Sequence, residues 1–100
     1  MQAAVIKYTT ESILAGLGYP NPLAAARQQA RMMLLGRLTR FQTVLQQFEQ
    51  TWGCTLDEMR ARYEQSGQEN FQVDDAYLEW QWYADAVETT RSQLTTVTAR

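Results

Sequence analysis

Apolar residues recur at alternating steps of three and four along two long segments of the chain. In the first segment they are Leu34, Leu38, Phe41, Leu45, Phe48 and Trp52. In the second the same spacing runs through Val73, Tyr77, Trp80, Ala84, Val87, Arg91 and Leu94. Heptad spacing of this kind is typical of helices that pack against each other along a seam. It predicts two long helices that form an antiparallel hairpin.

Turn and capping residues set the expected ends of the first long helix. Asn21 and Pro22 suit the N-cap and the first helical position, and Gly53 suits the C-terminal end. The helix expected over residues 22–52 is about 45 Å long at 1.5 Å per residue.

The remaining elements are shorter or less sharply bounded. Thr55 and Glu58 form a capping-box pattern for a short helix over 56–65, and the last long helix is expected over 74–97, after a linker over 68–73. Before Gly18 we expect a short helix over 10–17, preceded by an arm or strand over 1–8. The prediction is a single all-α domain over residues 1–100. A hairpin of this length has little interior, so we also expect a homodimer forming a helical bundle.

Charge is divided unevenly between the two parts of the chain. Residues 1–40 hold Lys7 and four arginines against Glu11, a net charge of +4, whereas residues 41–100 hold four arginines against ten acids, a net charge of −6. Such a division predicts two surfaces of opposite sign, or self-association that pairs them.

The residue types needed for most enzyme chemistry are missing. The chain has no histidine, and its single cysteine, Cys54, cannot form a Cys–His pair or a zinc site. The densest carboxylates, Asp74, Asp75 and Glu79, are explained by a helix start and an exposed face. We therefore expect no catalytic residue, no metal and no cofactor. A lone cysteine, an N-terminus unlike a signal peptide and no membrane-spanning apolar run predict a cytoplasmic protein.

Two groups of residues are left over as candidate binding sites. On the last long helix, Trp82 falls nearly opposite the seam with Leu78 beside it, and Asp75 and Glu79 share that sector. Aromatic anchors rimmed by charge are typical of protein interfaces. The alternative is that another part of the chain or a second copy covers Trp82 as core.

The second group is basic. Arg27 and Arg31 continue the first seam backwards, and Arg37 and Arg40 flank it. Arg27 and Arg31 are candidates for contact with a protein partner. The alternative is a solvated helix end that pairs with Asp85 or Glu88 of the antiparallel helix. All four arginines are also the candidates for contact with nucleic acid.

Two stretches resemble a family of small prokaryotic helical proteins. They are Phe48–Met59, F-E-Q-T-W-G-C-T-L-D-E-M, and Asn70–Trp80, N-F-Q-V-D-D-A-Y-L-E-W. Family members run approximately F-E-x-x-Y-G-x-x-x-x-E-F and then E-x-F-x-x-x-D-D-Y-L-E-W. This chain departs from that pattern at Trp52, Met59 and Ala76. The family resembles the TumA-type antitoxins, which pair with TumE-type toxins and are often encoded beside a small toxin gene.

The resemblance implies a non-enzymatic protein that neutralises a small toxin-like partner by forming a complex with it. Two other functions stay open. One is a structural or adaptor homodimer whose aromatic residues serve only its own interface. The other is a DNA-binding regulator, the weakest of the three for this chain acting alone, since its basic residues span a wide arc and Lys7 is its only lysine.

Overall fold

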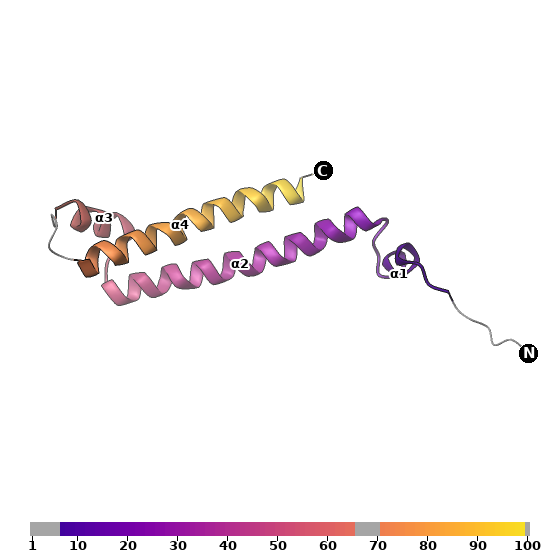
Figure 1. Cartoon of the computed structure of the whole chain (residues 1–100), viewed down its shortest axis with the longest axis horizontal. Coiled ribbons are helices and arrows are strands. Elements are labelled where there is room, and N and C mark those ends of the chain that lie inside the picture. Colours follow the sequence, from indigo (N-terminus) through magenta and orange to yellow (C-terminus); the bar gives the residue numbers. More distant parts are fainter. Residues whose placement is uncertain (1–6, 66–70, 100) are drawn as a thin grey trace, which may run out of the picture.

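The computed structural model describes residues 7–65 and 71–99, and this part of the chain is helical with no strand. The helices are α1 (Thr10–Gly16), α2 (Pro22–Trp52), α3 (Leu56–Gln65) and α4 (Phe71–Thr98). The long helices α2 and α4 pack side by side and antiparallel, as expected (Figure 1). None of the described helices is both long enough and apolar enough to cross a membrane.

Local capping explains three helix ends, namely both ends of α2 and the start of α3. The Asn21 side chain accepts a hydrogen bond of 2.8 Å from the Ala24 amide at the start of α2, and Gly53 ends α2 in the left-handed conformation with φ of 62°. Thr55 and Glu58 exchange hydrogen bonds at the start of α3. These contacts satisfy backbone groups that a helix end leaves without partners.

Two sequence expectations are only partly covered by the described residues. Helix α4 begins at Phe71, three residues before the expected start, so residues 71–73 of the expected linker are helical. Asp74 then lies in the first turn, where its charge still favours the N-terminal end of the helix. The rest of that linker, over 68–70, and most of the expected arm or strand over 1–8 lie outside the described residues.

The main core lies at the end of the hairpin where α3 joins the two long helices. Met59 of α3 and Trp80 of α4 are the two fully buried side chains among the described residues, at 0% and 1% exposed. The Phe48 ring of α2 stacks on Trp80, with centroids 5.4 Å apart and planes 11° apart. Cys54 is buried in the same cluster.

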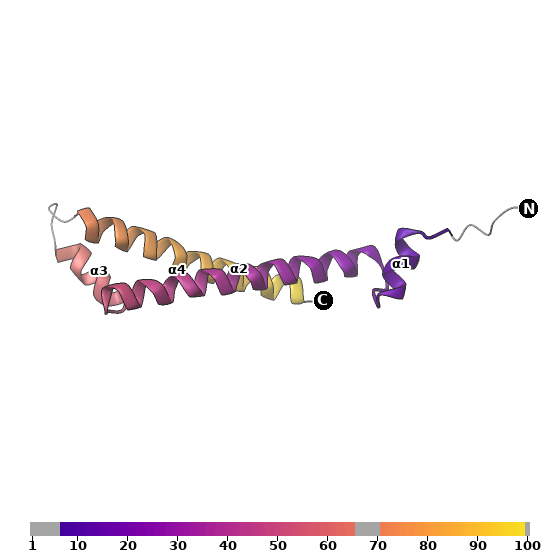
Figure 2. The ribbon, with the colours of Figure 1, turned by 90° about the horizontal axis from the view of Figure 1, so that it is seen from below.

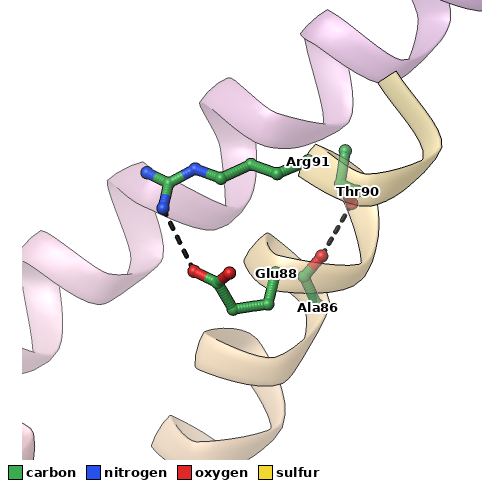
Figure 3. A network of polar contacts seen from close by, with 4 residues as sticks. All are labelled: Ala86, Glu88, Thr90 and Arg91. Carbon is green, nitrogen blue, oxygen red and sulfur yellow. Dashed lines mark hydrogen bonds and ion pairs between the residues drawn. The ribbon is translucent and has the colours of Figure 1, made fainter. Parts of the chain in front are cut away.

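The other half of the seam differs from the heptad prediction at one position. Arg91 was expected in the seam, but its side chain is 54% exposed and forms an ion pair of 3.1 Å with Glu88. Thr90 is buried instead, and its hydroxyl donates a 2.7 Å hydrogen bond to the Ala86 carbonyl (Figure 3). Val73, Trp80 and Val87 are buried at seven-residue steps, so the heptad repeat itself is kept. Its second position after Val87 lies three residues on, at Thr90, and not four residues on, at Arg91.

Substitutions at the two positions are expected to differ in how much they change the free energy of unfolding. Thr90→Arg places a long cation at a buried position and should lower the free energy of unfolding by about 2 kcal/mol or more. Arg91→Thr removes an exposed ion pair and should change that free energy by less than about 1 kcal/mol. Urea unfolding followed by circular dichroism measures both. Equal losses of stability would place Arg91 back in the seam.

Helix α3 is attached to one side of α4 by aromatic and polar contacts. The rings of Tyr63 and Tyr77 stack with centroids 4.6 Å apart. Arg60 donates hydrogen bonds of 3.1 Å to the Tyr77 hydroxyl and to the Gln81 side chain. The hydrogen bond that Arg60 donates to the Tyr77 hydroxyl is the main cause that raises the pKa of Arg60. These contacts use the Tyr77–Gln81 side of α4 and leave its Trp82 side uncovered by α3.

The opposite end of the molecule has almost no core. Helix α1 contacts α2 but buries none of its own residues, and Figure 2 shows it beyond the C-terminal end of α4. Ile13, Leu17 and Leu23 all remain exposed there. The thinnest extent of the whole chain is 20 Å, about two helix diameters, so the hairpin is a single layer with an uncovered face.

Candidate partner-binding face

Trp82 lies at the edge of the α2–α4 seam with more than half of its surface open to solvent. Its ring contacts Phe41 of α2 edge-on, with centroids 6.0 Å apart and planes 90° apart, and it meets Tyr83 in the same manner at 5.0 Å. The side chain is nevertheless 59% exposed. Trp82 therefore lies nearer the seam than the helical wheel indicated, because the long indole reaches back to α2. Its orientation is fixed by two rings while one side of the indole stays free.

The other three residues expected beside Trp82 are exposed on the same stripe of α4. Leu78 is 54% exposed, one turn before Trp82, and Asp75 and Glu79 are exposed next to it. Phe71, which was not singled out from the sequence, extends the apolar stripe by two further turns and is 74% exposed. This surface, formed by Asp75, Leu78, Glu79, Trp82 and the adjoining Arg37 and Phe41 of α2, is called the Trp82 face below.

A shallow groove of about 390 Å³ runs along the seam beside Trp82. Its lining residues are Arg37, Phe41, Trp82, Asp85, Ala86, Thr89, Thr90 and Gln93. A second hollow, lined in part by Met33 and Val97, shares Arg37 and Gln93 with it, so the groove continues towards the end that carries α1. One end of the groove is therefore aromatic, and the other is lined by small and polar side chains. The sequence did not reveal the groove, because its residues meet only once the register between α2 and α4 is known.

The four arginines expected to form a basic surface are all exposed on α2 but do not share one side. Arg37 lines the groove beside Trp82, whereas Arg31 lines another hollow with Leu35 and Leu94. These two arginines are six residues apart, about 120° around a helix, and lie on either side of Leu34 in the seam. Arg27 and Arg40 complete the set.

The pairing expected between these arginines and the acids of α4 is not formed. Within the described part of the chain, Glu88 pairs with Arg91 and Asp85 accepts a hydrogen bond of 2.9 Å from the Gln81 side chain. Neither acid pairs with an arginine of α2. Helix geometry explains this, because Glu88 and Asp85 reach partners three and four residues away on α4 itself. The arginines of α2 are thus left available at the surface.

Side chains of the metal-ligating types do not cluster within the described residues. No group of three His, Cys, Asp or Glu side chains in residues 7–65 and 71–99 is close enough to hold a metal ion. Cys54 is only 8% exposed within the core. The Trp82 face itself offers exposed apolar side chains and carboxylates.

Comparisons with protein-family models, with curated protein sequences and with solved structures found no match to this chain.

Proposed function

We propose that this protein is a non-enzymatic binding module that holds another protein on the Trp82 face. The observation that carries the proposal is the state of Trp82 itself, which is oriented by Phe41 and Tyr83 and yet 59% exposed. Tryptophan is among the residues that most often dominate interface energies, and a ring already held in place loses little freedom on binding.

The surroundings of Trp82 support a protein partner. Leu78 and Phe71 extend the apolar surface along α4, and Asp75 and Glu79 supply a charged rim. An apolar centre with a polar rim is the usual arrangement of a protein interface. The four arginines of α2, in contrast, are spread around the helix, whereas DNA binding favours basic residues gathered on one face.

The resemblance to the antitoxin family gives the proposal its partner class. We propose a small toxin-like protein that is neutralised by complex formation, in which this chain covers the partner's functional surface and needs no catalytic group. A cytoplasmic location is part of this proposal. An adaptor homodimer remains the second candidate, and it is favoured by the single-layer shape of the hairpin.

The test is complex formation with the product of the neighbouring gene, measured by light scattering and isothermal titration calorimetry. We expect a stable complex, and we expect Trp82→Ala to weaken it by at least about 2 kcal/mol, or about 30-fold in Kd. Leu35→Ala is the matched control, because Leu35 is also an exposed apolar residue but lies beside Arg31, away from Trp82.

Two results would contradict the proposal. One is that no complex forms with the wild-type chain. The other is that Leu35→Ala and Trp82→Ala weaken the complex equally, since the binding energy would then not lie on the Trp82 face. Circular dichroism of both variants shows whether the fold is retained, and the exposure of both side chains leads us to expect that it is.

A further inference from the structure

We infer that, in the absence of another partner, the Trp82 face is occupied by a second copy of this chain lying antiparallel to the first. The inference rests on the proposed function in that it uses the same face. It adds that the cognate partner must compete with self-association. Three features of the described residues support it: the distribution of charge along the hairpin, the shape of the Trp82 face and the large exposed surface area.

Charge changes sign from one end of the hairpin to the other. Residues 7–40 carry one lysine and four arginines against one glutamate, a net charge of +4. Residues 41–65 and 71–85 carry eight acids against two arginines, a net charge of −6. Because α2 and α4 are antiparallel, the rest of α4 lies along the basic end, where Glu88 and Arg91 pair with each other.

This distribution selects the direction of self-association. Two copies in parallel would bring like charges together at both ends, whereas two copies in opposite directions bring each basic end beside an acidic end. A two-fold axis that crosses the hairpin at right angles produces the second arrangement and uses the same surface on both copies. The charges therefore favour an antiparallel, two-fold dimer.

The shape of the Trp82 face is compatible with a two-fold axis. Trp82 stands at one end of the groove, and Ala86, Thr89 and Gln93 follow it along the same stripe of α4. An axis passing near Ala86 makes the two α4 helices antiparallel neighbours and places Trp82 of each copy beside the Thr89–Gln93 stretch of the other. The Trp82 ring of each copy then contacts smaller side chains of the other copy, so the two-fold axis produces this contact at two places.

The surface that remains exposed is large enough for such an interface. The chain exposes 7843 Å², about 2,000 Å² more than the roughly 5,800 Å² expected for a compact monomer of its mass, so an interface of about 1,000 Å² per subunit is available. Stable homodimers bury about that much per subunit or more. Helix α3 lies on the Tyr77–Gln81 side of α4, so it leaves the Trp82 face open to a second copy.

The direction of the dimer is tested with two cysteine substitutions, each made separately in the full chain. Ala86→Cys lies near the expected axis and should form an intermolecular disulfide with its own counterpart under mild oxidation. Thr96→Cys lies ten residues further along the same stripe, so its two copies would be about 30 Å apart in the antiparallel dimer and should not link. Linking of both variants would indicate parallel copies and overturn the inference. Linking of neither would remove the Trp82 face as the interface. Native Cys54 is buried and present in both variants, so the wild-type chain measures any linking through Cys54 alone.

The charge argument has its own test by analytical ultracentrifugation. Arg37→Glu/Arg40→Glu lowers the net charge of the basic end from +4 to zero, and Asp75→Lys/Glu79→Lys changes that of the acidic end from −6 to −2. Each double variant alone should dimerise at least about tenfold more weakly than the wild type, and mixing the two should restore a 1:1 heterodimer. A wild-type chain that is monomeric, or variants that dimerise as the wild type does, would overturn the inference.

The results of these experiments can be distinguished from the results of the test of the proposed function. The dimer is measured on this chain alone, and the complex is measured with the product of the neighbouring gene. If that complex forms through Trp82 while the chain alone is monomeric, only the antiparallel dimer is wrong. If the dimer forms as described and no such complex exists, the toxin-like partner is wrong and the adaptor homodimer is supported.

Discussion

Trp80→Ala is expected to abolish or nearly abolish the folded state. The Trp80 ring is 1% exposed and stacks on Phe48, and it is the largest fully buried side chain of the described residues. Replacing a buried tryptophan by alanine costs about 3–5 kcal/mol, because the transfer energy is lost and a cavity remains. A chain of this size is stable by about 5–15 kcal/mol at most, and here the core is confined to one end of a thin hairpin. The midpoint of thermal unfolding should fall by about 15 °C or more, or no cooperative transition should remain.

Trp82→Ala is the control for this prediction. It removes the same side chain two positions away but from a site that is 59% exposed, and it leaves the Phe48–Trp80 stack intact. We expect its unfolding midpoint, measured by circular dichroism at low protein concentration, to lie within a few degrees of the wild type. Equal destabilisation by the two variants would mean that Trp82 serves the chain's own core, and the Trp82 face would lose its principal contact.

The helical architecture followed from the sequence because the relevant signals are local. Capping side chains such as Asn21 and Thr55 bond to amides three residues away, so they mark the beginning of a helix in any tertiary setting. The seam of α2 was likewise correct, since Leu34 is buried and Phe41 and Phe48 contact aromatic rings of α4. The seam of α4 was wrong at Arg91. The pattern placed the second heptad position four residues after Val87, on the side of α4 where Tyr77 packs against α3, whereas the buried residue is Thr90, three residues after Val87.

The candidate face could be predicted only in part. The stripe of Asp75, Leu78, Glu79 and Trp82 follows from helical geometry alone, and all four residues are exposed. The contact between Phe41 and Trp82 and the groove beside them depend on the register between two helices. Register comes from the packing of specific rings, which a single sequence does not display. For the same reason, sequence analysis named Arg27 and Arg31 as candidates for contact with a protein partner, whereas the arginine that lines the groove beside Trp82 is Arg37.

The distribution of buried residues connects stability with binding. Tight packing is gathered where α3, the end of α2 and the start of α4 meet, around Met59 and Trp80. The rest of the hairpin has a narrow seam and a wide exposed surface, including Met32, Met33 and Leu35. A rigid end can hold Trp82 in place, while the remaining length offers area for a second chain. The folded state and the binding face therefore depend on the same corner of the molecule.

That dependence can be measured at Met59. Met59→Lys places an unpaired charge at a position that is 0% exposed, and we expect it to lower the free energy of unfolding of the α3 corner by at least about 3 kcal/mol. Cys54 packs in the same cluster and reports on the corner directly, because its thiol is buried in the closed state. If the corner opens more often, alkylation of Cys54 should become at least about 100-fold faster.

Met32→Lys is the matched control, since Met32 is 56% exposed on α2 and should tolerate the charge with no change in the alkylation rate. A rate for Met59→Lys equal to that of the wild type would show that α3 does not close over Cys54. If the rate rises as expected, binding through Trp82 should weaken in the same variant, although Met59 lies in the core and not on the Trp82 face. Such a loss would be structural in origin, because Phe48 packs against the cluster that holds Met59, and its ring contacts both Trp80 and Tyr83, the neighbour of Trp82.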